Sequence, residues 1–502
     1  MASAMSAAVR SRPDRVLERW EPVIGIEVHT QLRTASKMFC ACSTAYDGAP
    51  PNSHCCPVCL GLPGALPTIN RRAVELVVAT GVAIEATTPE RTVWERKNYF
   101  YPDLPKGYQI SQYLIPLAAD GRLTFDTSEG PVTIRIRRAH LEEDTAKLIH
   151  ATDGAGRRVS LVDFNRSGAP LMEIVTEADV RSAEQARRYA EELQLLLRSI
   201  GVSDADMERG QMRVEANVSL RERGTEPFGT RVEVKNMNSF RSVERAVAFE
   251  IARQAAALET GEPLVQETRG WNEDRGETYV MRLKEMSEDY RYFPEPDLPP
   301  LVVDRTWLDG IAGTLPELPA ARRRRFVEAL GIAPADAVTL VAEPAAGAVF
   351  EAALAAAAPA REAANWVTGE YLRLARKYGE GEVPHLEPAR IGAQLAELIT
   401  LVLGGELTRT NAKEAFESFV ASGRPVGEIV AERGLRSISD ADAIRGVVNE
   451  VLASNPAAVA DYRAGKGQAI GFLVGQVMKA TGGRANAGTV SAAIRQRLET
   501  GG

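Results

Sequence analysis

Apolar and polar residues alternate along several short stretches in the first half of the chain. In residues 23–32, Glu27 and His29 stand at alternate positions between valine, isoleucine and glycine residues. Because successive side chains of a strand point to opposite faces of a sheet, this spacing predicts a β-strand with Glu27 and His29 on one face. Residues 132–138 and 213–220 alternate in the same way, so we predict strands there as well.

Other stretches have the spacing of helices. Residues 182–199 begin with Ser182 and carry Gln185 three positions later, the pattern of a helix whose first turn is capped by side chains. A second helix is predicted over residues 242–259. After about residue 296 the chain becomes rich in Ala, Leu, Glu and Arg at helical spacing. Short helices near the end of the chain are predicted at 411–422, 440–452 and 488–498.

These patterns predict an α+β fold class with several domains, as expected for 502 residues. The stiff Leu-Pro-Pro sequence at 298–300 falls at the change in composition. We predict a disordered extension at 1–19, a mixed α+β domain at 20–295, a helical domain at 296–390, and an all-α tail domain at 391–502.

The N-terminal residues 1–19 contain no hydrophobic segment of the kind found in secretory signals. They are rich in Ala, Ser and Arg, which is compatible with a transit peptide, but we interpret them as a plain disordered extension. No run of about 18 uninterrupted apolar residues occurs, so no membrane span is predicted.

The formal net charge is −7, which argues against a protein whose whole surface binds nucleic acid. The charge is unevenly distributed, however. From Arg463 to the end, the chain has six basic residues and a single acid, Glu499. A charge run is often no more than a solvated face. In an acidic chain, this one-sided segment makes an RNA contact an open alternative.

All five cysteines lie between positions 40 and 59. Clustering in a long chain indicates a metal site rather than a disulfide scaffold. Cys40 and Cys42 form one pair and Cys56 and Cys59 another, and two thiolate pairs on tight turns can enclose a zinc ion. Four cysteine ligands leave no open position, so we predict structural zinc. Cys55 is an alternative to Cys56.

Three acidic stretches stand in apolar or alternating frames: Glu27 with His29, the acids at 142–144, and Glu173 in the apolar run 170–175. A carboxylate in an apolar run is costly unless it is paired or bound to metal. These groups can converge as ligands for Mg²⁺, which prefers oxygen, so that His29 would be an unusual ligand. Each acid alone could equally be a salt-bridge partner.

Phosphate-binding loops of the familiar glycine-rich kinds are absent, so a nucleotide would bind another type of site. Basic and aromatic residues alternate at 95–103 and 290–296, and residues 234–240 contain a lysine and two amides in a predicted turn. Rings can stack on bases, while Lys and Arg can hold phosphates. An aromatic core with a charged rim and a simple helix cap are the alternatives. The predicted nucleotide- or substrate-binding residues are Lys97, Asn98, Tyr99, Lys235, Asn236 and Arg291.

These motifs, taken in order, resemble the family of B subunits of aspartyl/glutamyl-tRNA(Asn/Gln) amidotransferases. The resemblance covers nearly the whole chain from about Trp20, and its many long motifs in one order make it specific. The matching segments are 23–32, 37–40, 59–64, 96–103, 107–112, 140–147, 161–166, 170–173, 234–240, 289–297, 465–467 and 471–479.

The resemblance implies a polypeptide with kinase and transamidase roles. Such a protein uses ATP to phosphorylate the side-chain carboxylate of Asp-tRNA(Asn) or Glu-tRNA(Gln), and ammonia then replaces the phosphate. The ammonia comes from glutamine through a glutaminase, the A subunit, in a cytoplasmic heterotrimer that includes the C subunit. The family's catalytic domain resembles the glutamine synthetase/guanidino kinase fold, and its tail domain grips tRNA.

Transferred position by position, the family's Mg²⁺ site falls on His29, Glu143 and Glu173, with Glu27 nearby, and we expect these four residues to be catalytic. The cysteine quartet is similar to the form of the family that keeps zinc. The doublet of Cys55 and Cys56 departs from the pattern, which leaves open which of the two is the ligand.

Two alternatives compete with this interpretation. A zinc-bearing tRNA-binding adaptor without catalysis would keep the cysteines and the basic tail but would not need the acids. A stand-alone carboxylate–amine ligase for a small molecule would not need the helical C-terminal third. The sequence leaves open whether Asp-tRNA(Asn), Glu-tRNA(Gln) or both are used.

Overall fold

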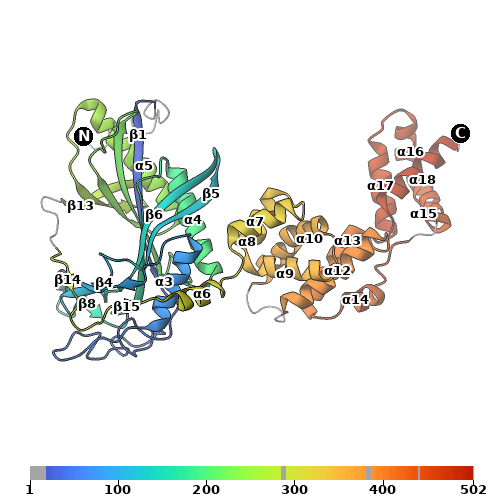
Figure 1. Ribbon diagram of the computed structural model, residues 1–502. Helices are drawn as coiled ribbons and strands as arrows, with labels where there is room; N and C mark the ends of the chain where they lie inside the picture. The colour runs from blue at the N-terminus through green and yellow to red at the C-terminus, as the bar shows by residue number, and fades with distance from the viewer. Residues whose placement is uncertain (1–17, 284–289, 380–385, 439–440, 501–502) are drawn as a thin grey trace. The chain divides into compact units, whose positions relative to one another are not determined.

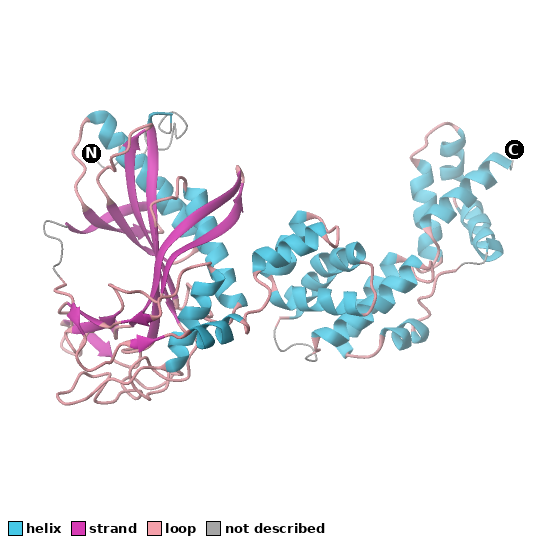
Figure 2. Ribbon diagram, in the orientation of Figure 1, coloured by secondary structure: helices cyan, strands magenta, loops and turns pink. Residues whose placement is uncertain are grey.

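A computed structural model describes residues 18–283, 290–379, 386–438 and 441–500 (Figure 1). The chain forms two compact units, Met1–Pro319 and Ala320–Gly502. Most of the predicted N-terminal extension, residues 1–17, lies outside the described residues. The two units correspond to the change in composition seen in the sequence, since strands occur in the first unit and helices dominate the second (Figure 2).

An eight-stranded sheet organises the first unit, with the order β13-β12-β11-β10-β1-β9-β6-β5. Neighbouring strands are antiparallel, except that β11 and β12 are parallel. The strands are β1 (Trp20–Gln31), β5 (Ala118–Thr127), β6 (Gly130–Glu143), β9 (Pro170–Thr176), β10 (Met212–Glu222), β11 (Val232–Met237), β12 (Glu267–Asn272) and β13 (Glu277–Leu283).

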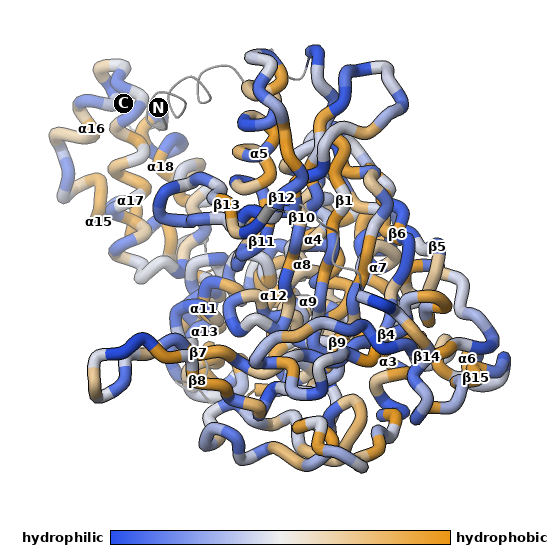
Figure 3. The backbone as a smooth tube through the Cα atoms, turned by 90° about the vertical axis from the view of Figure 1, so that its left-hand side faces the viewer, coloured by the Kyte–Doolittle hydropathy of each residue, from blue (hydrophilic) through white to orange (hydrophobic). Residues whose placement is uncertain are grey.

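The two faces of this sheet differ in polarity because of the alternation within its strands. On β1, the side chains of Ile24, Ile26 and Val28 are fully buried, whereas Glu27 and His29 point to the other face. The predicted strands at 23–32, 132–138 and 213–220 are confirmed. In Figure 3 hydrophobic and hydrophilic residues alternate along β10 and around α5.

Three helices cover the apolar face: α3 (Arg71–Ala83), α4 (Ala183–Ser199) and α5 (Phe240–Thr260) (Figure 1). Both helices predicted in this unit are confirmed. The Ser182 side chain accepts a hydrogen bond from the Gln185 amide, and the Gln185 side chain accepts one from the Arg181 amide. The first bond satisfies an amide that lacks a partner in the first turn of α4, and the second satisfies the amide just before the helix.

Three small sheets complete the first unit. The strands β14 (Phe293–Pro294), β3 (Glu95–Asn98) and β4 (Tyr108–Ser111) form one of them, which brings two distant segments side by side (Figure 1). The other two are β15 (Leu301–Val302) with β2 (Arg91–Thr92), and the hairpin of β7 (Lys147–Thr152) and β8 (Arg158–Asp163).

The predicted domain boundary at 295/296 differs from the observed one, because the first unit continues to Pro319. The buried side chains of Leu298, Val303 and Ile311 belong to the core of the first unit. The helix α6 (Arg305–Ala312) packs on α3. The change in composition at residue 296 therefore marks neither the end of the strands, since β15 follows it, nor the end of the hydrophobic core.

Among the described residues of the second unit, regular structure is helical, as predicted. Its elements are α7 (Pro319–Glu328), α8 (Pro334–Ala342), α9 (Pro344–Ala355), α10 (Ala360–Asn365), a π-helix (Trp366–Tyr371), α11 (Leu372–Tyr378), α12 (Pro388–Leu403), α13 (Arg409–Ser422), α14 (Val426–Glu432), α15 (Ala441–Ser454), α16 (Pro456–Arg463), α17 (Ala469–Ala480) and α18 (Ala487–Thr500). No single helix in the described ranges is long and apolar enough to cross a membrane, and α8 with α9 meets that test only as a pair bent by 115°.

The predicted boundary at 390/391 also differs from the packing, since it would separate the start of α12 from the rest of that helix. Helix α12 packs along α9 and belongs with the helices before it. Helices α15–α18 instead share a separate hydrophobic core. Its fully buried side chains include Leu473, Val477, Val490 and Ile494. The C-terminal bundle therefore begins near residue 441.

We expect that a chain ending at Ser437 keeps the remaining fold. The remaining residues lose the bond from Thr408 Oγ1 to the Gly483 carbonyl, 3.0 Å. At about 1 kcal/mol, its loss should lower the thermal unfolding midpoint by less than about 8 °C. Circular dichroism against temperature measures this. A chain ending at Glu387 is the control. It should lose the fold of the helical unit, because removing α12 exposes the side of α9 on which α12 packs.

Candidate functional site

Strand register brings two histidines and a glutamate into one row on the polar face of the large sheet. His29 on β1 lies directly opposite Glu173 on β9, and Glu173 lies directly opposite His140 on β6. Residues that are directly opposite in a sheet point to the same face. The Nε2 atoms of His29 and His140 are 3.4 and 3.9 Å from Glu173 Oε2.

Two further carboxylates join this row. Glu27 Oε1 lies 3.7 Å from His29 Nε2, and Glu142 Oε1 lies 3.4 Å from His140 Nε2. The result is two overlapping groups with ligand atoms close enough to hold a metal ion, Glu27–His29–Glu173 and His140–Glu142–Glu173. Three carboxylates and two imidazoles in one buried place form a donor set suited to a divalent cation.

Glu143, predicted as a magnesium ligand, is not in this cluster. It is one position beyond Glu142, so its side chain leaves the strand on the opposite side. There it forms an ion pair with Lys106 and accepts a hydrogen bond from the Ile110 amide at 3.1 Å. The structure therefore brings together the predicted residues Glu27, His29 and Glu173, and places Glu142 where Glu143 was expected.

The protonation of the cluster reflects its excess of negative charge. Burial and the neighbouring Glu173 carboxylate raise the pKa of Glu27 to about 7. Burial opposes a charge on His29, but its hydrogen bond to Glu173 and the nearby carboxylates outweigh this and raise its pKa to about 9. The site therefore holds protons at neutral pH in a place that a divalent cation can take, which fits the predicted Mg²⁺.

Basic side chains surround the acids. Lys97 Nζ is 3.9 Å from Glu142 Oε1, and an Arg138 nitrogen is 3.3 Å from Glu173 Oε1. Lys235 donates to Glu215 at 2.7 Å. Burial works against a charged Lys97, but the carboxylates of Glu142 and Glu173 raise its pKa. The site thus contains fixed cations that can face the phosphates of a nucleotide.

A cavity of about 460 Å³ lies over these groups, and its walls combine charged and aromatic side chains. The rings of Tyr113 and Tyr292 are stacked, with centroids 4.7 Å apart and planes 18° apart. The Arg138 guanidinium lies 4.9 Å from the centre of the Tyr113 ring. Tyrosines in stacks of this kind can receive a flat base.

The predicted nucleotide-binding residues divide into two groups. Lys97, Tyr99 and Lys235 line the cavity, and the other three do not. Asn98 donates to the Tyr290 and Arg291 carbonyls and so holds β3 against that segment. Asn236 has a positive φ of 64° and lies 3.4 Å from the Tyr279 hydroxyl, and Arg291 is exposed with a φ of 44°.

Several residues of the cluster or the cavity were not among the predicted site residues: His140 of the cluster, and Glu142, Arg138, Tyr113, Tyr292, Arg213 and Glu215 of the cavity. The alternation of Arg138, His140 and Glu142 along β6 is the signal that would have selected the first three, because the strand continues to Glu143. The tyrosines reach the cavity only through tertiary packing. For Arg213 and Glu215, the signal is their position opposite His29 and Glu27.

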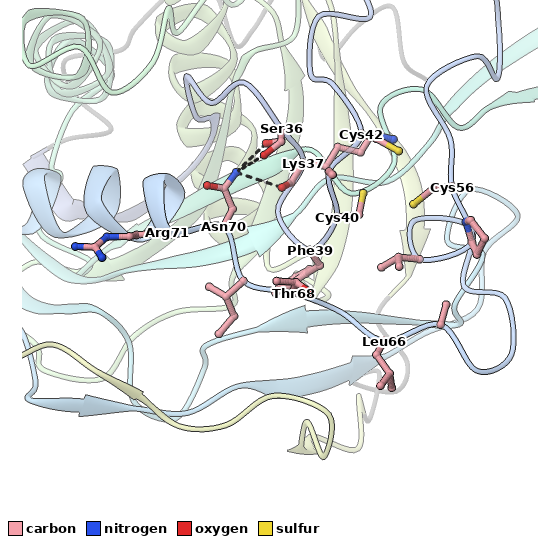
Figure 4. A pocket seen from close by; sticks show the side chains of 15 residues that line it. Ser36, Lys37, Phe39, Cys40, Cys42, Cys56, Leu66, Thr68, Asn70 and Arg71 are labelled. Carbon is pink, nitrogen blue, oxygen red and sulfur yellow. Dashed lines mark hydrogen bonds between the residues drawn. The ribbon is translucent and has the colours of Figure 1, made fainter.

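The cysteine quartet is a second, separate cluster. The sulfur atoms of Cys40, Cys42, Cys56 and Cys59 lie within 4.8 Å of one another. Figure 4 shows the first three of these side chains turned toward one another beside a cavity of about 930 Å³. Hydrogen bonding from the Cys40 thiol, the Cys56 amide and the charge of Lys37 outweigh burial and lower the pKa of Cys59 to about 4. Four cysteine sulfur atoms at this spacing fit a tetrahedral zinc ion, which would bind them as thiolates.

Cys55 lies outside the quartet. Its sulfur is 4.0 Å from the Asn165 side-chain oxygen, and burial raises its pKa. Of the doublet, Cys56 is the residue whose sulfur approaches Cys59, at 3.8 Å. The geometry therefore favours Cys56 over Cys55 as the fourth ligand.

The first unit is similar to a known class of catalytic domains. The family model of the GatB/GatE catalytic domain matches residues 22–309, and the family model of the GatB domain matches residues 348–498. The first match contains both the carboxylate–imidazole cluster and the cysteine quartet. This defines the class of the protein as one with a GatB/GatE catalytic domain.

Curated relatives narrow the class to one family. A protein of Roseiflexus sp. (strain RS-1) is 52% identical over 95% of this chain and 97% of its own length. One of Thermomicrobium roseum is 52% identical over 96% and 99%, and one of Moorella thermoacetica is 50% identical over 95% and 100%. Each is named as the B subunit of an aspartyl/glutamyl-tRNA(Asn/Gln) amidotransferase. The chain belongs to this family, that of the B subunits of the tRNA-dependent amidotransferases.

Replacing Glu142 with Gln should weaken the binding of Mn²⁺, used as a reporter for Mg²⁺, by at least about tenfold, or ~1.4 kcal/mol. Glu142→Gln removes an anionic oxygen that lies in the cluster. Glu143→Gln is the matched control one position away and should keep the affinity. Electron paramagnetic resonance of free Mn²⁺ measures both. Loss of affinity in Glu143→Gln with retention in Glu142→Gln would show that the geometric assignment is wrong.

Metal affinity should rise with pH. Below pH 7 both Glu27 and His29 hold protons, and between 7 and 9 only His29 does, because their pKa values are about 7 and about 9. A metal that binds both residues must displace these protons. The logarithm of the association constant should therefore increase with a slope near two below pH 7 and near one up to pH 8.5. A pH-independent Mn²⁺ affinity would exclude both residues as ligands.

Proposed function

We propose that this chain is the ATP-using component of a tRNA-dependent amidotransferase. It transfers the γ-phosphoryl group of ATP to the side-chain carboxylate of Asp-tRNA(Asn), Glu-tRNA(Gln) or both. The observation that carries the proposal is the convergence of Glu27, His29, Glu142 and Glu173 with Lys97 in one cavity. This cavity lies in the unit that matches the catalytic domain.

The proposed reaction has two steps. A carboxylate oxygen of the aminoacyl side chain attacks the γ-phosphorus, the bond to the bridging oxygen breaks, and ADP leaves. Ammonia then attacks the acyl carbon, loses a proton, and displaces inorganic phosphate to leave the amide. Phosphorylation is needed because an oxide ion is a poor leaving group, whereas phosphate is a good one.

The residues of the cavity can assist the first step by charge and position. An anionic carboxylate and an anionic phosphate repel one another, so catalysis requires neutralisation and alignment. Mg²⁺ bound by Glu27, His29, Glu142 and Glu173 would supply part of that positive charge. Lys97 and Arg138 contribute fixed positive charge beside the same carboxylates.

The aromatic wall of the cavity suits a base. Tyr113, Tyr290 and Tyr292 stand close together, and Lys97 Nζ lies 5.1 Å from the centre of the Tyr290 ring. Stacking on tyrosine tolerates any base, so this wall can receive the adenine of ATP or the terminal adenosine of tRNA. The neighbouring cations would then face the phosphates.

The remaining components follow from the family. Ammonia is mostly protonated in water at neutral pH, so a glutaminase partner, the A subunit, has to deliver it in sheltered form. A heterotrimer is completed by the C subunit. We place this complex in the bacterial cytoplasm and assign tRNA binding to the helical tail. We assign structural zinc to Cys40, Cys42, Cys56 and Cys59, and propose that the sheet domain resembles the glutamine synthetase/guanidino kinase fold.

The test is ATP hydrolysis by the chain assembled with its A and C partners. We expect stimulation by Glu-tRNA(Gln) or Asp-tRNA(Asn), none by the uncharged tRNAs, and amide formation when glutamine is added. Glu142→Gln should reduce ATP turnover by at least about 100-fold, because a group that holds the cation is lost, while tRNA affinity by filter binding stays unchanged. Tight tRNA binding by the native complex without ATP turnover would indicate the non-catalytic adaptor instead.

A further inference from the structure

A lysine side chain lies beside the cysteine quartet in a place where lysines are rarely found. Lys37 has no solvent-exposed surface and is among the largest fully buried side chains of the described residues. Its Nζ atom is 3.6 Å from Cys59 Sγ, 2.8 Å from the His54 carbonyl oxygen and 3.3 Å from the Phe164 carbonyl oxygen. Three acceptors thus account for its three N–H donors.

The surroundings of Lys37 lack the usual anionic partner. Within the described ranges, no carboxylate oxygen lies within ion-pair distance of its Nζ atom. The nearby buried Glu143 pairs with Lys106 instead. Burying an ammonium group without an opposite charge costs several kcal/mol. Two carbonyl dipoles offset part of this cost, and the sulfur atoms are the remaining source of negative charge.

We infer that Lys37 is the cationic partner of metal-bound thiolates and that it ties the metal centre to the loop leading into β9. This inference rests on the proposed metal site at the four cysteines. Four thiolates around a divalent cation carry a net charge of −2, and one ammonium group halves that excess. An N–H donated to a ligand sulfur also fixes the orientation of the ligand, as outer-shell partners of metal sites do.

Several hydrogen bonds connect residues 37–59 to the loop at 164–169, which leads into β9. While Lys37 Nζ donates to the Phe164 carbonyl, the Ser167 hydroxyl donates to the Cys59 carbonyl at 3.2 Å. The Met38 amide donates to the Gly168 carbonyl at 2.8 Å. β9 begins two residues later and carries Glu173. The metal centre, Lys37 and the loop at 164–169 therefore form one connected structure next to the candidate active site.

Gly168 shows how closely these parts are packed. It has a positive φ of 83°, and a Cβ atom placed on it would be 3.4 Å from Cys59 Cβ and 3.6 Å from Lys37 Cδ. A side chain at this position would be strained by the backbone conformation, and its Cβ atom would already be in van der Waals contact with both residues. The loop thus passes directly over the lysine and its sulfur partner.

The decisive variant is Lys37→Met, which keeps an unbranched apolar chain and removes the ammonium group. We expect the full-length variant to hold Zn²⁺ 10- to 100-fold more weakly than the native chain, measured by competition with a chromophoric chelator. Lys37→Arg retains the positive charge and should bind Zn²⁺ more tightly than Lys37→Met. An unchanged Zn²⁺ affinity in Lys37→Met would overturn the inference.

Controls separate this inference from the metal site on which it rests. Cys55→Ala removes a neighbouring thiol outside the quartet and should leave the Zn²⁺ affinity unchanged, whereas Cys56→Ala should abolish tight binding. Native protein that takes up no Zn²⁺ would overturn both the metal site and the inference. Native protein with tight Zn²⁺ and no effect of Lys37→Met would overturn the inference alone. ATP turnover plays no part in these measurements.

A second measurement avoids variants, in case Lys37→Met does not fold. Hydrogen–deuterium exchange of the native chain is compared with Zn²⁺ bound and after removal by a chelator. Because the loop is tied to the metal centre, amides at 164–169 should exchange at least about tenfold faster without Zn²⁺. Amides of α5, which lie elsewhere in the unit, serve as the internal reference. Equal exchange at 164–169 in both states would contradict the proposed tie.

Discussion

Antiparallel pairing of β1 and β9 sets His29 directly opposite Glu173, and pairing of β9 with β6 sets Glu173 directly opposite His140. Every other feature of the candidate active site depends on this register. A shift of one residue would turn the whole polar row toward the helices and expose the apolar residues. The buried isoleucines of β1, which belong to the same hydrophobic core as the buried residues of α4 and α5, oppose such a shift. The core therefore fixes the register, and the register assembles the site.

The same register brings three carboxylates together under partial or complete burial. Glu27, Glu142 and Glu173 meet there, with His29, Lys97 and Arg138 as neighbouring cations. The raised pKa of Glu27 is the electrostatic result. A buried acidic site of this kind is costly as a structural feature alone. A cation bound in the cavity would lower the free-energy cost of burying these carboxylates. The same groups that make the fold less stable would therefore favour cation binding.

Residues 37–59, which carry the cysteine quartet and are here called the cysteine insert, contain a buried charge of the opposite sign. Lys37 is a buried cation whose neighbours include sulfur atoms but no carboxylate at ion-pair distance in the described part of the chain. Buried carboxylates on the sheet and a buried ammonium group beside thiols in the insert are two costly sets of buried charges in one unit. They are joined by residues 164–169, which contact the insert and continue into β9.

The sequence by itself predicted three strands of the large sheet, two long helices and a cluster of four cysteines, because these depend on local periodicity and spacing. It also selected Glu27, His29 and Glu173, which the structure brings together. It also determined family membership through the order of its motifs, in agreement with the relatives. Tertiary structure placed Glu142, and not Glu143, beside His140 and Glu173, since adjacent acids differ only in the face to which a paired strand turns them. It likewise decided the unit boundary at Pro319, because residues after the last strand complete a core assembled from distant segments. The sequence also could not predict the tyrosine wall or the hydrogen-bond partners of Lys37, because these contacts join residues that are far apart in the chain.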